Sequence, residues 1–277
     1  MSNQSKKQEN NYLQADCEQC FGLCCTALPY AKSADFAFNK DGGMPCISLQ
    51  SDYRCSIHSN LRNNGFRGCA VYECFGAGQK VSQVTYNGCS WRDNSALAKE
   101  MFDVFPIMQQ LHEMLSYLNE SLQREEAKPI YSDLQDVFEK TESLTNLSPP
   151  FILELDVTAH RMIVNELLLK TSELVRANIS PKKKSKQNRG SSLIGAKLKG
   201  ADLKGTSLRG ALLIAADLRE ADMRVCDMIG ADLRDADLSG ADLTESIFLT
   251  QAQVNSAKGD RYTKLPRLLS TPEHWKH

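Results

Sequence analysis

The chain has 277 residues, of which 42% are hydrophobic and 24% are charged, and its 33 basic and 34 acidic residues leave a formal net charge of -1. This balance excludes a global electrostatic field that would select nucleic acid or an anionic membrane as a partner. No apolar run approaches the roughly 20 residues that span a bilayer, so we expect a cytoplasmic protein without a membrane segment. In that compartment, clustered cysteines bind metal or do redox chemistry more often than they form disulfides.

Composition divides the chain into five segments. The first is rich in cysteine and glycine and has little periodicity, so we expect its fold to need stabilisation by a group such as a metal ion. In chain order we expect a cysteine-rich metal-binding domain over residues 12–93, a helical region over 94–179, a basic linker over 180–190, a repeat domain with a capping helix over 191–257, and a tail over 258–277.

Nine of the ten cysteines lie before residue 90, and four of them are crowded into "CEQCFGLCC". A CxxC pair is the usual way for a short loop to present two thiolates to one ion. It also fits a thioredoxin-like dithiol, although the strand-to-helix context of such a site is weak here. If this stretch were helical, Cys17, Cys20 and Cys24 would share one face and Cys25 would point about 100° away. The doubled cysteine therefore indicates two metals, a cluster, or one thiol left over.

The same segment resembles the family of zinc- or iron-chelating domains named for the motif CxxCxxxCC. The later cysteines of that family are matched by those in "GMPCISL", "YRCSIH" and "FRGC". The resemblance implies that zinc or iron is held by the ligands Cys17, Cys20, Cys24, Cys25, Cys46, Cys55 and Cys69, and it leaves the number of ions open. The segment before Cys69 is longer than the family pattern and lacks its proline. His58, Cys74 and Cys89 are further candidates whose roles the sequence leaves open.

Apolar residues recur at three- and four-residue steps over 97–122, which predicts an amphipathic helix. Pro106 falls inside this stripe and predicts a kink or a fresh start. Further helices are expected near 132–145 and over about 156–175, giving a small bundle whose apolar faces form a core. The linker that follows has five basic residues and no aromatic one, so nucleic acid is not the expected partner.

Twelve consecutive pentads start at Ser191. The third residue of each pentad is Leu, Met or Phe, and the first is small, as at Cys226, which we interpret as a buried and inert substitute for alanine. These residues resemble the pentapeptide repeat family with its signature A(D/N)LXX. The resemblance implies a right-handed quadrilateral β-helix with about 20 residues per turn. The five-residue period ends near "FLTQAQVNSAKGD", which predicts a short capping helix that begins at Thr250.

Three functions follow from these patterns. The leading hypothesis is a metal-binding protein whose repeat domain is a scaffold for a protein partner. The alternative is an iron-dependent or thiol-based enzyme acting on a peptide or small molecule, although no catalytic residue is indicated and lone histidines on helices, such as His112 and His160, are usually structural. Some pentapeptide repeat proteins mimic DNA and bind type II topoisomerases, but the short repeat and its mild acidic excess fit that function poorly.

Overall fold

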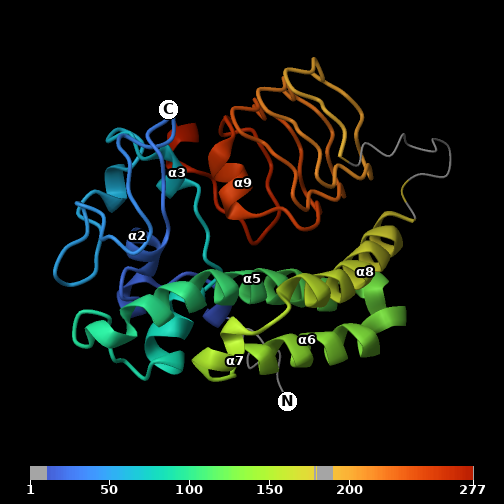
Figure 1. The fold of residues 1–277 in the computed structure, drawn as a ribbon. Coiled ribbons are helices and arrows are strands. Elements are labelled where there is room, and N and C mark those ends of the chain that lie inside the picture. The colour runs from blue at the N-terminus through green and yellow to red at the C-terminus, as the bar shows by residue number, and fades with distance from the viewer. Residues whose placement is uncertain (1–10, 178, 180–189, 277) are drawn as a thin grey trace. The chain divides into compact units, whose positions relative to one another are not determined.

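The computed structural model describes residues 11–177, 179 and 190–276 (Figure 1). The chain divides into two compact units: unit 1 consists of Met1–Asn119 and Ser132–Glu166, and unit 2 of Glu120–Tyr131 and Leu167–His277. The expected basic linker over 180–190 lies outside the described residues except for Gly190. The domain boundaries that composition indicated remain predictions.

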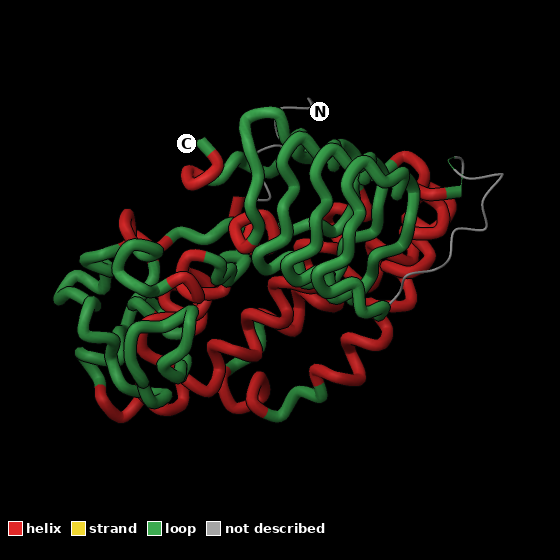
Figure 2. The backbone as a smooth tube through the Cα atoms, turned by 90° about the horizontal axis from the view of Figure 1, so that it is seen from above, coloured by secondary structure: helices red, strands yellow, loops and turns green. Residues whose placement is uncertain are grey.

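Helices are the main regular elements of the described chain, as the red segments of Figure 2 show. The η segments are 3-10 helices except η4, which is a π-helix. In chain order they are η1 (Asn11–Leu13), η2 (Cys17–Gln19), α2 (Leu23–Ala27), η3 (His58–Asn60), α3 (Arg67–Ala70), α4 (Ala77–Gln79), η4 (Lys80–Thr85), η5 (Ser95–Leu97), α5 (Ala98–Leu122), η6 (Glu125–Ile130), α6 (Tyr131–Thr145), α7 (Pro149–Leu153), α8 (Val157–Arg176), α9 (Gln251–Ser256) and η7 (Glu273–Trp275).

The N-terminal part of unit 1 is built from turns, short helices and two isolated antiparallel bridges. Tyr30 pairs with Lys40, and Leu49 pairs with Cys55. The ring of Tyr30 stacks on that of Phe36 with centroids 4.5 Å apart. Both pairings are single-residue bridges, so the described residues of this segment form no sheet.

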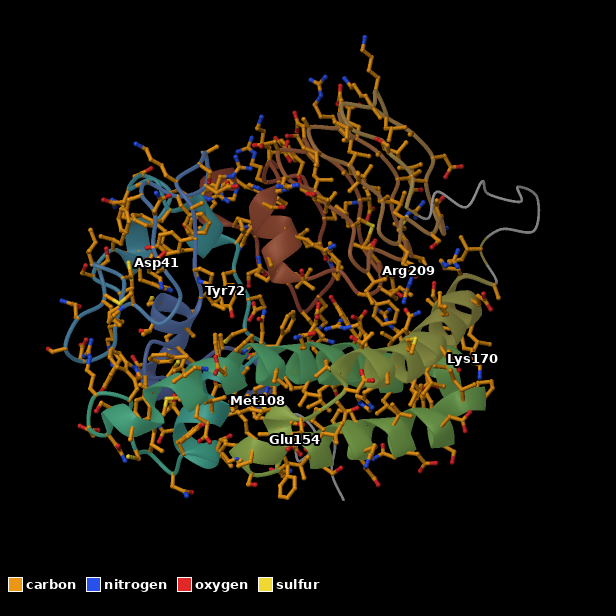
Figure 3. All side chains as sticks on the ribbon, in the orientation of Figure 1. Asp41, Tyr72, Met108, Glu154, Lys170 and Arg209 are labelled. Carbon is orange, nitrogen blue, oxygen red and sulfur yellow. The ribbon has the colours of Figure 1, made fainter. Side chains whose placement is uncertain are left out.

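A long helix forms one wall of the unit 1 core. α5 contributes Met101, Val104, Phe105 and Met108, all buried, to a cluster that also holds Leu23 of α2. Figure 3 labels Met108 on α5. The three-and-four spacing of these residues is what predicted the helix, and the prediction is confirmed. The helices expected near 132–145 and 156–175 are confirmed as α6 and α8, whereas α7 was not predicted.

α5 runs through Pro106 without ending, so of the two predicted alternatives the fresh start is wrong and the kink stays a prediction. Proline removes one backbone donor from the helix. The buried residues on both sides of it, Phe105 and Met108, keep the helix in one register against the core. Tertiary packing therefore outweighs the local cost of the proline.

Residues 191–248 of unit 2, which we call the repeat coil, wind with a period of 20 residues. Each parallel bridge within the repeat coil joins the second residue of a pentad to the second residue four pentads later, as in Ser192 with Leu212 and Leu212 with Asp232. The fifth residue of each pentad, from Gly195 to Glu245, has a left-handed φ between 54° and 70°. A left-handed residue bends the chain between one bridge and the next, which explains why glycine is common at this position.

The prediction of a right-handed quadrilateral β-helix is wrong. Among the described residues there is no β-strand and no sheet, and the pentads pair only through isolated single-residue bridges. The left-handed residue comes three positions after each bridging residue, so no stretch stays extended long enough to form a ladder. The prediction of strands came from the resemblance to the family. The left-handed residue at the end of each pentad prevents the continuous extended backbone that a strand needs.

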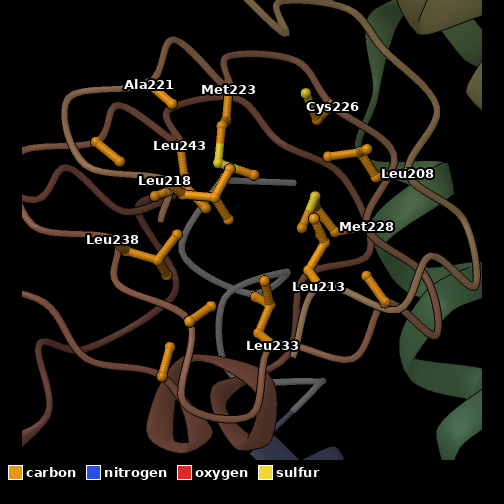
Figure 4. Packing of buried hydrophobic residues seen from close by; sticks show 14 of the residues in the cluster. Leu208, Leu213, Leu218, Ala221, Met223, Cys226, Met228, Leu233, Leu238 and Leu243 are labelled. Atoms are coloured by element: carbon orange, nitrogen blue, oxygen red, sulfur yellow. The ribbon is translucent and has the colours of Figure 1, made fainter. Parts of the chain in front are cut away.

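The inside of the repeat coil is apolar (Figure 4). Third-position residues are buried from Leu203 to Phe248, and the small first-position residues between them are buried as well. The thiol of Cys226 is fully buried and donates to the carbonyl oxygen of Leu203 at 3.0 Å. Burial raises the pKa of Cys226 to about 12, so the thiol stays protonated. Its interpretation as a buried replacement for alanine is confirmed.

The capping helix predicted at Thr250 is confirmed as α9. The Thr250 side chain accepts from the backbone N–H of Gln253, whose own side chain accepts from the backbone N–H of Thr250, forming a capping box. The Gln253 amide also donates to the carbonyl oxygens of Met228 and Ala231, at 2.8 Å each. These bonds satisfy carbonyl groups of the last complete turn of the coil.

The C-terminal segment continues the packing of unit 2. Lys258 and Lys264 form parallel bridges with Asp237 and Asp242. The indole of Trp275 is 2% exposed and donates to the carbonyl oxygen of Ala257 at 2.9 Å. Within the described ranges, no helix combines the length and the apolar character needed to cross a membrane.

Candidate metal centre

All seven cysteines predicted as ligands lie in unit 1. Cys17 is exposed, Cys46 is buried, and the others are half-buried. All ten cysteines of the chain are described, and each has a free thiol. The nine thiols of unit 1, unlike the buried Cys226, are therefore available to bind a metal or to react.

The segment "CEQCFGLCC" is not one helix, so the helical projection expected from its spacing does not apply. Cys17 begins η2, Cys20 has extended backbone angles, and Gly22 is left-handed at φ 66°. Cys24 and Cys25 then fall within α2. Cys20 and Cys24 nevertheless pack against the same apolar cluster.

Cys24 and Cys25 are electrostatically linked, because their sulfur atoms lie 4.0 Å apart. The hydrogen bond from Cys24 lowers the pKa of Cys25, and the nearby Lys40 ammonium lowers it further. The same bond, with burial, raises the pKa of Cys24. With a metal–sulfur length of about 2.3 Å, two ligands of one tetrahedral ion would be about 3.8 Å apart. The separation alone thus allows the pair to share one ion, contrary to the expected divergence.

Backbone amides point at several of the sulfurs. The N–H groups of Leu23 and Gly22 donate to Cys20, although burial dominates and raises the pKa of Cys20 to about 11. The N–H of Ile57 donates to Cys55. Amide donors stabilise a thiolate and are common around metal-bound cysteines. These amide donors offset part of the effect of burial, which raises the pKa of both thiols.

A buried ammonium lies among the later cysteines. Lys40 is 7% exposed, and its Nζ donates to the carbonyl oxygens of Thr26, Asp41 and Met44 at 2.8–3.0 Å. Burial lowers the pKa of Lys40, while the thiolate charges of Cys46 and Cys25 raise it. A fixed positive charge of this kind compensates the negative charge that thiolate ligands accumulate.

The structure brings the predicted ligands into one region but does not close them around a point. In the part of the chain that the structure describes, no group of three or more His, Cys, Asp or Glu side chains lies close enough to hold a metal ion. The donor set nevertheless fits a thiophilic metal, since several sulfurs are neighbours and amide donors face two of them. Zinc or iron, if bound there, would draw these side chains together.

The additional candidates occupy different surroundings. His58 is exposed at the start of η3, and its backbone N–H donates to the carbonyl oxygen of Cys55. Cys89 is half-buried in the turn after η4. Cys74 lies beside Cys20, because both sulfur atoms are within 4 Å of the point where Gly78 would carry a Cβ. The sequence left Cys74 undecided, and the signal that could have identified it is the repeated tripeptide "CFG", which occurs at Cys20 and again at Cys74.

The two helical histidines have structural surroundings. His112 is 1% exposed, and its Nδ1 bonds the carbonyl oxygen of Phe75 at 2.8 Å. Burial lowers the pKa of His112 to about 4, so the ring is neutral near pH 7. His160 Nε2 bonds Thr141 Oγ1 at 2.8 Å. Both rings thus help to join elements within unit 1.

The outer surface of the repeat coil carries paired charges. Within single pentads, the guanidinium groups of Arg219 and Arg224 each donate two hydrogen bonds to the aspartate two residues earlier, at 2.5–2.8 Å. The hydrogen bond from Arg219 lowers the pKa of Asp217 to about 2. Because the carboxylates are matched by guanidinium groups, this surface alternates in sign.

The pentads define the class of the protein. The family described as "Pentapeptide repeats" matches residues 191–228 and 211–248, in eight copies. Over 265 residues, covering 95% of each chain, the protein is 71% identical to "Uncharacterized protein YybG" of Bacillus subtilis (strain 168). The chain belongs to the same family of pentapeptide-repeat proteins as YybG. Because the similarity is much longer than the repeats, the family relationship includes the cysteine-rich unit 1.

Proposed function

We propose that this protein binds zinc or iron in the cytoplasm through the thiolates of unit 1, and that its repeat coil is a scaffold for a protein partner. The ligands are those implied by the CxxCxxxCC motif: Cys17, Cys20, Cys24, Cys25, Cys46, Cys55 and Cys69. The observation that supports the proposal is that seven free thiols distant in sequence lie in one unit, with backbone amides directed at Cys20 and Cys55. Metal ligation would also compensate for the small apolar core of this segment.

Metal analysis of the full chain tests the first part. Protein purified without oxygen is expected to contain stoichiometric zinc or iron by elemental analysis, and its visible absorption distinguishes colourless zinc from iron. Serine in place of Cys20 and Cys55 is expected to lower the metal content, whereas Cys226→Ser, in the repeat coil, is the matched control. Protein that contains no stoichiometric metal and keeps its fold after strong chelation would contradict the proposal.

The scaffold function is supported by the repeat family and by the outward-facing charges of the coil. Alternating charges give specificity to a protein contact more readily than they imitate the uniform negative field of DNA. We therefore propose that the partner is a protein other than a DNA-binding topoisomerase. A photo-crosslinking residue at Arg224 in the full chain is expected to form a discrete adduct in cells. The same residue at Lys99, an exposed position in unit 1, is the control, and equal labelling at both positions would argue against the scaffold.

A further inference from the structure

The two ends of the repeat coil differ in how well their interior is covered. At the C-terminal end, α9 contributes Val254, which is fully buried in the apolar cluster of the coil. At the other end lies the first turn, residues 191–210. Its interior residues Leu193 and Leu198 are only partly buried, whereas Leu213 and Leu218, one turn later, are fully buried. The apolar interior is therefore accessible at the N-terminal end.

The backbone at this end has the pairing pattern of the later turns but lacks their partners. Leu212 donates its N–H to the carbonyl oxygen of Ser191 at 2.9 Å, and its own carbonyl oxygen accepts from the N–H of Leu193 at 2.8 Å. The bridging residue of each later pentad thus directs both of its backbone groups at the turn before it. Among the described residues, no backbone bond satisfies the equivalent groups of three bridging residues in the first turn: Ser192, Lys197 and Asp202.

The fourth side of the first turn is covered from within unit 2. Arg176 donates from Nη1 to the carbonyl oxygen of Gly205 at 3.2 Å, and a Cβ on Gly205 would lie 3.2 Å from the side chain of Ile179. Ser207, the fourth bridging residue, is 1% exposed. The bridging residues on the other three sides are exposed. We call residues 192–202 the open edge.

The rim of the open edge is positively charged. Residues 191–210 contain four basic residues and one acidic residue, whereas residues 231–250 contain one basic residue and five acidic residues. Lys199 pairs with Glu220 of the second turn at 3.2 Å. Lys197 and Lys204 have no ion-pair partner in the part of the chain that the structure describes. A basic rim favours an acidic partner and repels a second copy of the same edge.

The composition of the preceding segment does not suit it to cover the open edge. Residues 180–189 contain five basic residues and no aliphatic or aromatic one. They supply neither apolar side chains for the exposed leucines nor carboxylates for the lysines. Lysines beside an unpaired edge also discourage the association of identical edges. The occupant that fits both the charge and the backbone pattern is a segment of a different protein.

We propose, on the basis of the proposed scaffold function, that the open edge binds an extended acidic segment of the protein partner by β-augmentation. The backbone of the segment pairs with Lys197 and its neighbouring bridging residues, and its carboxylates contact the ammonium groups of Lys197 and Lys204. Its apolar side chains cover Leu193 and Leu198. Main-chain bonds of this kind provide affinity, while the side chains provide specificity. The segment adds to the stack of turns without displacing any bond of the coil.

The binding of a labelled peptide to the full chain, measured by fluorescence anisotropy, tests this inference. The probe has the sequence of residues 231–245, which is acidic and has the pentad pattern. Reversing both charges, in Lys197→Glu with Lys204→Glu, is expected to weaken binding by about tenfold. Lys99→Glu, at an exposed position of unit 1, is the matched control and leaves binding unchanged.

A second pair of variants tests the backbone contact. Lys197→Ala and Lys197→Pro both remove the ammonium group, but only the proline also removes the N–H at the open edge. We expect Lys197→Pro to bind the peptide about fivefold more weakly than Lys197→Ala. Equal affinities of these two variants would contradict pairing at the edge. Circular dichroism identifies a misfolded variant, and in that case the comparison of peptides on the unchanged chain decides the question.

The other occupants give different results. A scrambled peptide of the same composition, or a single-stranded oligodeoxynucleotide, that binds as tightly as the probe would reduce the effect to a general attraction of anions and overturn the inference. A dimer of the unchanged chain in sedimentation that Lys197→Pro dissociates would assign the edge to a second copy. Absence of peptide binding also overturns the inference. If the adduct at Arg224 still forms in that case, the scaffold function stands and only the open edge fails.

Discussion

Adjacent leucines in one pentad allow the packing of the repeat coil to be tested with a matched pair. Leu213 is fully buried, whereas Leu212, one residue earlier, is 39% exposed. Leu→Ala removes three carbons, worth about 2.4 kcal/mol when buried at about 0.8 kcal/mol each. The cavity left behind raises the expected cost of Leu213→Ala to about 3–4 kcal/mol. Solvent fills the space left by Leu212→Ala, so we expect that variant to cost about 1–1.5 kcal/mol.

The assay is urea unfolding of the full chain. The chain has two tryptophans, so in a Trp91→Phe background the fluorescence of Trp275 reports unit 2. The two variants have the same composition and differ by one position, so effects on the unfolded chain largely cancel. We expect their free energies of unfolding to differ by about 2 kcal/mol. Equal destabilisation, or a larger effect of Leu212→Ala, would refute the assignment of third-position residues to the interior.

Three further changes have defined outcomes. Gly259→Ala would place a Cβ 2.6 Å from the ring of Trp275, so we expect the indole to be displaced, with red-shifted emission and a lower urea midpoint. Replacing Lys40 by Met leaves three carbonyl oxygens without its ammonium, and the free energy of unfolding of unit 1, followed by hydrogen exchange, should fall by about 1–3 kcal/mol. The hydrogen bond from Arg219 lowers the pKa of Asp217 to about 2, below the unfolded value of about 3.9. The contribution of this pair to stability is therefore present above about pH 4 and is lost as the pH falls toward about 2. In an Arg219→Gln variant, the carboxyl resonance of Asp217 should titrate near the unfolded value, and an unchanged titration would contradict the cause assigned here.

The repeat shows what a sequence pattern determines and what it does not. The period of five and the size of the first and third residues identified the interior positions, because burial depends directly on apolarity and volume. The strand assignment failed because it came from resemblance to a family. The left-handed backbone at Glu220 and Glu245, where glycine is absent, could not be read from residue type.

The cysteine site was predicted in part. Seven candidate ligands followed from spacing and motif, and the structure places them in one unit. The sequence alone could not say which of them are neighbours in space, since Cys25 lies near Lys40 and is joined to Cys46 by a backbone hydrogen bond. Cys74 was undecided because it lies outside the motif, although its "CFG" context matches that of Cys20.

The 20-residue period of the repeat coil restricts how the gene can change in length. Deleting one pentad, such as residues 216–220, would keep later leucines at interior positions. It would also pair Leu212 with Asp237 in place of Asp232, so every surface row that crosses the deletion would change its partners, whereas later pairs such as Asp222 with Asp242 would stay in register. Duplicating 20 residues would instead lengthen the coil and preserve each row. A lineage that depends on the pattern of this surface should therefore tolerate insertions in multiples of four pentads and reject shorter ones.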